Sequence, residues 1–275
     1  MTLLDAQRSR LTPERPTLVG RSQRVPFRFR AFLLHLLGSA TLLALVLGVL
    51  YVGWYRWPGW YLAGMPHVAM VLVAVDVAVG PLLTLVIASP AKPRRVLARD
   101  IAVIVAVQLV ALTYGSVTLW RGRPLYYAFS VDRLQMVQAY DLDAPEIALG
   151  RQHNPELAPT WHSRPRWIWA PLPDDPKIQN KIVASTIAGG ADVIQMPRYF
   201  KPWDRGLPEL RRQLKEVGDL KSFTKPERQV LKRRMLQQGF SVDQPTTMLF
   251  TGRAGAVLAV FDRKTMRLAA VLAPD

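Results

Sequence analysis

The sequence contains no cysteine, and this absence excludes two kinds of chemistry. Without a thiol there is neither a disulfide framework nor a thiol nucleophile, so any exported part of the chain must be held together by its apolar core alone. Histidine is scarce as well, with four in 275 residues. His153 and His162 show no metal-ligand spacing, and no G-x-S-x-G motif is present. We therefore predict no enzyme, no catalytic residue, no metal site and no cofactor.

Acidic residues are few relative to basic ones, which gives a formal net charge of +16. Such an excess raises the question of nucleic-acid binding, but the densest basic run, Lys232 to Arg234, has the character of a solvated helix face and no interleaved aromatic motif accompanies it. Eleven of the 36 basic residues lie next to long apolar runs, where attraction to anionic lipid heads explains them. We expect membrane lipids as partners and neither nucleic acid nor a small-molecule substrate.

Long apolar runs occur only in the first half of the chain. Each of the three is about long enough to cross the hydrocarbon core of a bilayer at roughly 1.5 Å per residue. They are Ala31 to Gly53, His67 to Ser89 and Ile101 to Trp120. The fold class we predict is an integral membrane protein with three transmembrane α-helices followed by a small mixed α+β domain with antiparallel hairpins. The predicted divisions are a basic, disordered arm over 1–30, the membrane region over 31–120 and the α+β domain over 121–275.

The positions of lysine and arginine predict the orientation, because basic residues in short flanking segments are retained in the cytoplasm. The segment between the first two runs, Trp54 to Pro66, has only Arg56. The other two flanks carry Arg8, Arg10, Arg15, Arg21, Arg24, Arg28 and Arg30, and Lys92, Arg94, Arg95 and Arg99. The N-terminus is therefore predicted to be cytoplasmic and the C-terminal domain extracytoplasmic, although Arg121 and Arg123 count against it. In a bacterial inner membrane, the extracytoplasmic side is the periplasm.

The first apolar run is longer than the core of a signal peptide and ends in an aromatic belt. We therefore predict that it is retained as a membrane anchor.

Polar residues inside the predicted spans are costly and point to function by default. Asp76 is the only acidic residue within a span, and helix geometry puts it roughly 18 Å from the inner end, near Tyr114 at about 20 Å. Gln108, at about 10 Å, lies nearer His35 and Ser39. These residues predict two hydrogen-bonded layers in a three-helix bundle. Asp76 has two possible roles: it ties the protein's own helices together, or its carboxyl meets a polar group on an incoming transmembrane helix.

Gly80 and Pro81 interrupt the second span close to Asp76. Proline removes one backbone donor, which should free the carbonyl four residues back, at Val77, and kink the helix. A neighbouring helix, the hydroxyl of Thr84 or a local adjustment must then satisfy that carbonyl. Small residues here allow close helix approach, either within this bundle or to a partner helix. They are Gly38, Ser39 and Ala40 in the first span and Ala74, Ala78 and Gly80 in the second.

Two of these spans carry a resemblance to a known family. The run from Val75 through Asp76, Gly80 and Pro81 to Leu85, followed by Pro90 and Lys92, resembles the second-helix signature of the type IV pilin accessory proteins, often called TfpX/TfpZ. The run Gln108 to Gly115 is similar to the third-helix pattern of that family. A weaker likeness to its extracytoplasmic domain lies at Gly189 to Asp192, before Pro197 and Tyr199.

The resemblance implies a non-enzymatic accessory factor, a chaperone that binds a type IV pilin and stabilises it or modulates its assembly into pili. The pilin would be contacted through its transmembrane helix, with its head domain as a further contact. The residues we assign to partner binding on this basis are Asp76, Gly80, Pro81, Thr84, Gln108 and Tyr114. A membrane-anchored extracytoplasmic sensor, with the basic arm carrying the signal, is the alternative from a different functional class.

The second half of the chain reads as alternating strands and helices. Leu125 to Phe129 with Leu134 to Tyr140, and Ala256 to Phe261 with Arg267 to Leu272, predict two hairpins. Helices are predicted at Pro176 to Ala188, Leu207 to Val217 and Lys225 to Gln238, the last with a capping box from Thr224 and Glu227. Asp174 and Asp175 suit the positive N-terminal end of the first of these helices. Pro165 to Pro173 is predicted to be an edge strand or an extended segment.

Overall fold

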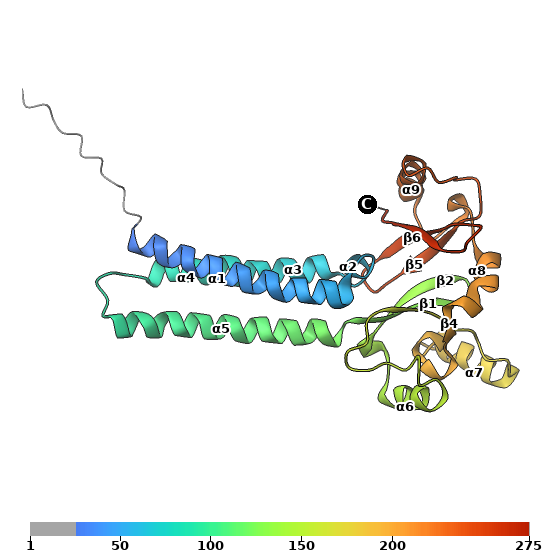
Figure 1. Cartoon of the computed structure of the whole chain (residues 1–275), viewed down its shortest axis with the longest axis horizontal. Helices are drawn as coiled ribbons and strands as arrows, with labels where there is room; N and C mark the ends of the chain where they lie inside the picture. The colour runs from blue at the N-terminus through green and yellow to red at the C-terminus, as the bar shows by residue number, and fades with distance from the viewer. Residues whose placement is uncertain (1–25, 275) are drawn as a thin grey trace, which may run out of the picture.

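The structure, a computed structural model, describes residues 26–274 and consists of three long apolar helices followed by a mixed α+β domain (Figure 1). Residues 1–25 of the arm predicted over 1–30 lie outside the described residues, so the predictions made for them stay predictions. Phe27 to Arg30, the end of that predicted arm, are helical and belong to the first span. The helices run side by side along one direction and the sheet packs across their far end (Figure 1). The start of α1 and the loop before α5 lie at the opposite end of the bundle from the sheet (Figure 1).

All three apolar helices are long enough to cross a membrane. They span Phe27–Tyr55, Met65–Ile87 and Arg94–Arg121. The first and third extend beyond the predicted apolar runs at both ends, and the second is shifted toward the N-terminus. Two of them change helix type along their length: α1 continues into a π-helical turn, η2, and the second consists of α3, the π-helical segment η3 and α4. The bounds are α1 Phe27–Leu50, η2 Tyr51–Tyr55, α2 Gly59–Leu62, α3 Met65–Val73, η3 Ala74–Val79, α4 Gly80–Ile87 and α5 Arg94–Arg121.

The domain that follows is built on a curled seven-stranded sheet. The strands run in the order β4-β3-β1-β2-β5-β6-β7, with the pairs β1–β3 and β2–β5 parallel and the other pairs antiparallel. Their bounds are β1 Pro124–Ser130, β2 Arg133–Gln138, β3 Arg166–Trp169, β4 Lys201–Pro202, β5 Thr247–Thr251, β6 Ala256–Phe261 and β7 Leu268–Leu272. β1 follows α5 after two residues, so the sheet begins directly at the end of the third span.

Both faces of the sheet are covered, and the inner strand β1 is accordingly apolar at nearly every position. Every residue of β1 is buried. Its alternate residues Tyr127 and Phe129 join one core cluster, while Tyr126 and Ala128 join another on the opposite face. The helices that follow the first hairpin pack around this sheet. They are α6 Ala144–His153, α7 Pro176–Ile187, α8 Leu207–Gln213 and α9 Lys225–Gln237, joined by short 3₁₀ turns η4 Ala139–Asp141, η5 Val193–Gln195, η6 Pro197–Tyr199, η7 Trp203–Gly206 and η8 Val217–Asp219.

Several local predictions for this domain are confirmed. Both hairpins form, as β1–β2 and β6–β7. Asp175 caps α7 by accepting a hydrogen bond from the Lys177 N–H at 2.8 Å. The capping box of α9 is present, with the Thr224 N–H donating to Glu227 at 2.6 Å, and these contacts hold the pKa of the exposed Glu227 carboxyl below its usual value.

Two predictions in this domain are wrong in detail. The segment Pro165 to Pro173 contains β3, but β3 is not an edge strand, because the two-residue strand β4 pairs with its outer side. The helix predicted over Leu207 to Val217 ends at Gln213. It stops there because Lys215 leaves the helix to bridge Thr247, exchanging backbone hydrogen bonds of 2.9 and 3.0 Å.

The tip of the loop between the first two spans is built into the core of the sheet domain. Leu62 of α2 is fully buried in the cluster that contains Tyr127 and Phe250. Its carbonyl accepts a hydrogen bond from the Ala254 N–H at 3.0 Å. Gly252 fits only without a side chain, since a Cβ there would lie 2.5 Å from both the Cβ and the carbonyl oxygen of Leu62. The membrane helices and the sheet therefore share one core at this end.

Replacing the shared core residue tests this coupling. We expect Leu62→Ala to lower stability by about 2–5 kcal/mol, because it leaves a cavity between the bundle and the sheet. Leu34→Ala is the matched control, since Leu34 is 73% exposed on α1. Thermal unfolding of the detergent-solubilised protein should show a lower midpoint for Leu62→Ala alone. Equal midpoints for the two variants would show that the loop tip contributes nothing to the sheet's core.

Candidate functional site

The interruption of the second span by Pro81 produces a change of helix type. Over Ala74–Val79 the backbone is π-helical, and the Gly80 N–H bonds the Val75 carbonyl, five residues back. With this five-residue spacing, the backbone N–H of residue 81 would donate to the Asp76 carbonyl. Residue 81 is proline and has no N–H, so the Asp76 carbonyl lacks its backbone donor. The prediction that Val77 carries the freed carbonyl is therefore wrong by one residue.

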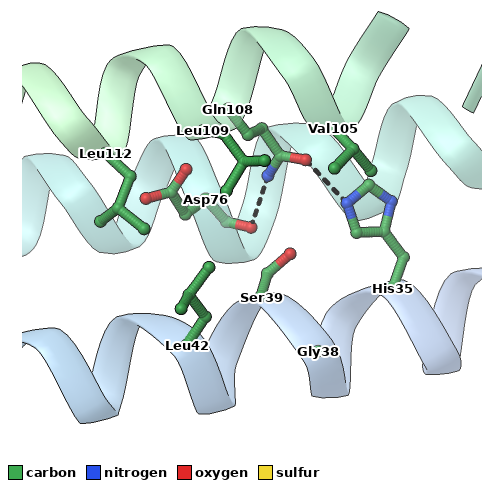
Figure 2. A pocket seen from close by; sticks show the side chains of 9 residues that line it. All are labelled: His35, Gly38, Ser39, Leu42, Asp76, Val105, Gln108, Leu109 and Leu112. Carbon is green, nitrogen blue, oxygen red and sulfur yellow. Dashed lines mark hydrogen bonds between the residues drawn. The ribbon is translucent and has the colours of Figure 1, made fainter. Parts of the chain in front are cut away.

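The side chain of Gln108 on α5 supplies the missing donor. Its Nε2 donates to the Asp76 carbonyl at 2.9 Å, and its Oε1 accepts from Nε2 of His35 at 2.7 Å (Figure 2). The other ring nitrogen of His35, Nδ1, lies 2.5 Å from Oγ1 of Thr84 on α4. Because the Gln108 amide oxygen can only accept, Nε2 of His35 is the donor in that contact. One chain of hydrogen bonds thus links all three spans.

Gly80 allows this close contact. A Cβ at position 80 would lie 2.1 Å from Nε2 of Gln108 and 2.3 Å from its Cδ, well inside any tolerated contact. The neighbouring residues Pro81 and Thr84 are also buried in the bundle. Gly80, Pro81 and Thr84 therefore act together: Pro81 removes a donor, Gly80 makes room for its replacement, and Thr84 holds the histidine that orients the replacing amide.

The carboxyl group of Asp76 takes no part in this network. The residue is only 4% exposed, yet neither carboxyl oxygen has a hydrogen-bond partner among the described residues. The group lies in a cavity of about 200 Å³ between α1 and α5 (Figure 2). The cavity is lined by His35, Gly38, Ser39, Leu42, Asp76, Val105, Gln108, Leu109 and Leu112. The helices are thus tied together by the backbone of Asp76, while its side chain faces an apolar cavity.

The predicted polar layers are only partly present. The level of Gln108 and His35 forms as predicted, with Thr84 in place of Ser39 as the third member. Tyr114, predicted to lie beside Asp76, instead points away from the bundle and is 75% exposed. Depth along a helix is a count of residues, whereas the direction of a side chain depends on helix rotation, which the sequence count did not address. Of the six residues assigned to partner binding, Tyr114 alone lies apart from the network.

Another cavity, more polar than the first, lies in the sheet domain beside the start of α6 and the end of α7. Its volume is about 340 Å³, and it is lined by Tyr140, Asp141, Asp143, Glu146, Gly189, Gly190, Ala191, Gln195 and Arg253. The cavity thus includes most of the Gly189 to Asp192 motif. Burial raises the pKa of the Asp141 carboxyl, while the Gln138 N–H and the nearby Arg253 guanidinium oppose that rise. The charged groups of this cavity differ in sign and are partly paired, Glu146 with Arg198 at 3.1 Å among them.

The described residues contain no cluster of three or more metal-ligating side chains. The bundle cavity places the unpaired Asp76 carboxyl in the same lining as His35 and Ser39.

Comparison with known proteins finds similarity to fimbrial assembly proteins. The chain is 25% identical over 206 residues to the fimbrial assembly protein, serogroup I, of Dichelobacter nodosus, a match that covers 74% of this chain and 77% of the relative. It is 29% identical over 125 residues to the fimbrial assembly protein of serogroups C1 and C2 of the same organism, covering 46% of this chain and 95% of that protein. The serogroup E1 protein is 23% identical over 206 residues. These names describe assembly and not catalysis. No family model and no solved structure matched the chain.

The site makes a testable prediction about Gly80. Gly80→Ala should displace Gln108 and leave the Asp76 carbonyl and Nε2 of His35 without partners, at a cost of about 1–3 kcal/mol. Gly48→Ala is the control, because a Cβ at position 48 of α1 meets nothing within 4 Å. Thermal unfolding in detergent should show a lower midpoint for Gly80→Ala and an unchanged or slightly higher one for Gly48→Ala. Unaltered stability in Gly80→Ala would mean that the Gln108 bonds contribute little.

Proposed function

We propose that this protein is a non-enzymatic accessory factor of pilus assembly that binds a type IV pilin in the bacterial inner membrane, and that it stabilises the pilin or modulates its incorporation into the pilus. The observation that carries the proposal is the similarity to three fimbrial assembly proteins, which in two of them extends over 77% of their length. A role in assembly requires contact with a pilus component. The second and third spans resemble those of type IV pilin accessory proteins, and this resemblance implies the pilin as that component.

The structure offers two surfaces compatible with such a partner. A pilin held in the membrane by an apolar helix, with its head outside, would lie alongside both the helical bundle and the sheet domain. The shared core around Leu62 fixes these two parts relative to each other, so one partner can contact both. The unpaired carboxyl of Asp76 supports a contact within the membrane, because an acid buried without a partner favours a group that brings a hydrogen-bond donor.

Purification from native membranes tests the proposal. Pilin should accompany the wild-type protein solubilised in mild detergent, as detected by mass spectrometry. We expect Asp76→Ala to reduce the amount of pilin recovered about tenfold, which corresponds to the loss of one good hydrogen bond. Val86→Ala, at a position 73% exposed on α4, should recover as much pilin as the wild type. If pilin is absent from the wild-type sample, the proposed function is wrong.

The proposed orientation places the N-terminus in the cytoplasm and the sheet domain in the periplasm. The absence of cysteine makes single-cysteine labelling straightforward. Ile187→Cys, at an 83% exposed position of the sheet domain, should react with a membrane-impermeant maleimide in spheroplasts. Ala91→Cys, exposed in the loop between the second and third spans, should react only after the membrane is broken. The reverse pattern would invert the topology.

A further inference from the structure

The cavity that contains the Asp76 carboxyl is an opening in the side of the bundle. Two hydrogen-bonded contacts join the first and third spans: the His35–Gln108 bond near the N-terminal part of α1, and the Tyr55 hydroxyl, which donates to the Leu119 carbonyl at 2.7 Å near the sheet domain. The cavity lies between these two levels. Leu42 and Leu109 line it and are also 40% and 45% exposed, so they mark its mouth on the outer surface of the bundle.

The size of the cavity limits what can enter it. Its volume is about 200 Å³, somewhat larger than the roughly 150 Å³ cavity that holds a benzene molecule in an engineered protein core. A whole helix, about 10 Å across, does not fit. One side chain does. The geometry therefore suits a helix that lies against α1 and α5 from outside and projects a single side chain past Leu42 and Leu109.

The chemistry of the cavity specifies that side chain. Its walls are mostly apolar, with Leu42, Leu109 and Leu112 among them. The amide of Gln108 is already committed at both ends, to His35 and to the Asp76 carbonyl. Among residues 26–274, nothing donates a hydrogen bond to either oxygen of the Asp76 carboxyl, and the group is buried where water cannot easily replace a donor. The component that these residues do not supply is a hydrogen-bond donor.

We infer that this opening binds one hydrogen-bond-donor side chain from the transmembrane helix of the pilin, and that the Asp76 carboxyl accepts from it. This inference rests on the proposed function, because the pilin is the partner it names. The donor is either a cationic group, which pairs with the ionised carboxyl, or a hydroxyl or amide, which bonds it without a charge. Asp76 then has a recognition role, and the Gln108 network has the separate role of holding the helix around it.

Site-specific photo-crosslinking in native membranes tests the inference. A benzophenone amino acid replaces Leu42 or Leu109 at the mouth, or Val86 on the exposed side of α4 as the control. We expect pilin adducts from positions 42 and 109 and none from 86. Combining the position-42 probe with Asp76→Leu should reduce the adduct about tenfold. With Asp76→Asn, a neutral donor should retain most of the adduct, because the amide oxygen still accepts, whereas a cationic donor should lose it.

Folding is checked separately. Asp76→Leu removes an unpaired buried acid but leaves the Asp76 backbone carbonyl bonded to Gln108, so its thermal midpoint should equal or exceed that of the wild type. A second variant, Gly38→Leu, fills part of the cavity from α1 without replacing Asp76, since a Cβ at position 38 meets nothing within 4 Å, and should lower pilin recovery, while Val86→Leu should not.

Several outcomes would overturn the inference and still leave the proposed function standing. One is pilin that co-purifies but crosslinks equally from position 86. Another is a pilin adduct from position 42 that is unchanged by Asp76→Leu. Adducts with lipid alone, or with a second copy of this chain, would assign the opening to a different occupant. If no pilin co-purifies with the wild type at all, the proposed function fails first and this inference fails with it.

Discussion

Pro81 deprives its own helix of one backbone donor inside the apolar part of the bundle, and the rest of the membrane region is arranged around replacing it. Lipid offers no substitute, so another helix must supply the donor. Gln108 does so from α5, and it reaches the Asp76 carbonyl only because residue 80 has no side chain. His35 and Thr84 then fix the orientation of that amide. A single missing N–H thereby determines which residues of three different helices must lie together.

The same replacement separates the two polar groups of Asp76. Its carbonyl is bonded within the bundle, and its carboxyl is left in the opening between α1 and α5 without a partner. In an α-helix, the carbonyl left without a donor by Pro81 would be that of Val77. The π-helical turn therefore places a bonded carbonyl and an unpaired carboxyl on one residue. At the other end of the bundle, Leu62 ties the spans to the sheet, so the bundle and the sheet domain are fixed relative to each other.

The apolar runs and the turn residues made much of this fold predictable. Long hydrophobic segments define the three spans, alternating residues around short polar turns define both hairpins, and Thr224 with Glu227 marks the start of α9. Residue counting also placed His35 and Gln108 at one level. It could not give rotation about the helix axis, which is why Tyr114 was expected beside Asp76 but faces outward. The sequence predicted that Pro81 would leave the Val77 carbonyl without a donor, because an α-helical spacing of four residues was assumed. The π-helical spacing of five residues makes it the Asp76 carbonyl instead. The strand order was likewise out of reach, since β3 becomes internal only through its pairing with the distant β4.

The central claim is that the Asp76 carboxyl accepts a hydrogen bond from the pilin. The most direct measurement is the infrared absorption of that group in bilayers, isolated as the difference between wild-type protein and Asp76→Asn, with and without added pilin. The account predicts that pilin shifts the Asp76 carboxyl band, either by strengthening a hydrogen bond to the neutral acid or by converting it to the carboxylate. A band that stays in place while pilin is bound would contradict the account, because the carboxyl would then have no part in recognition.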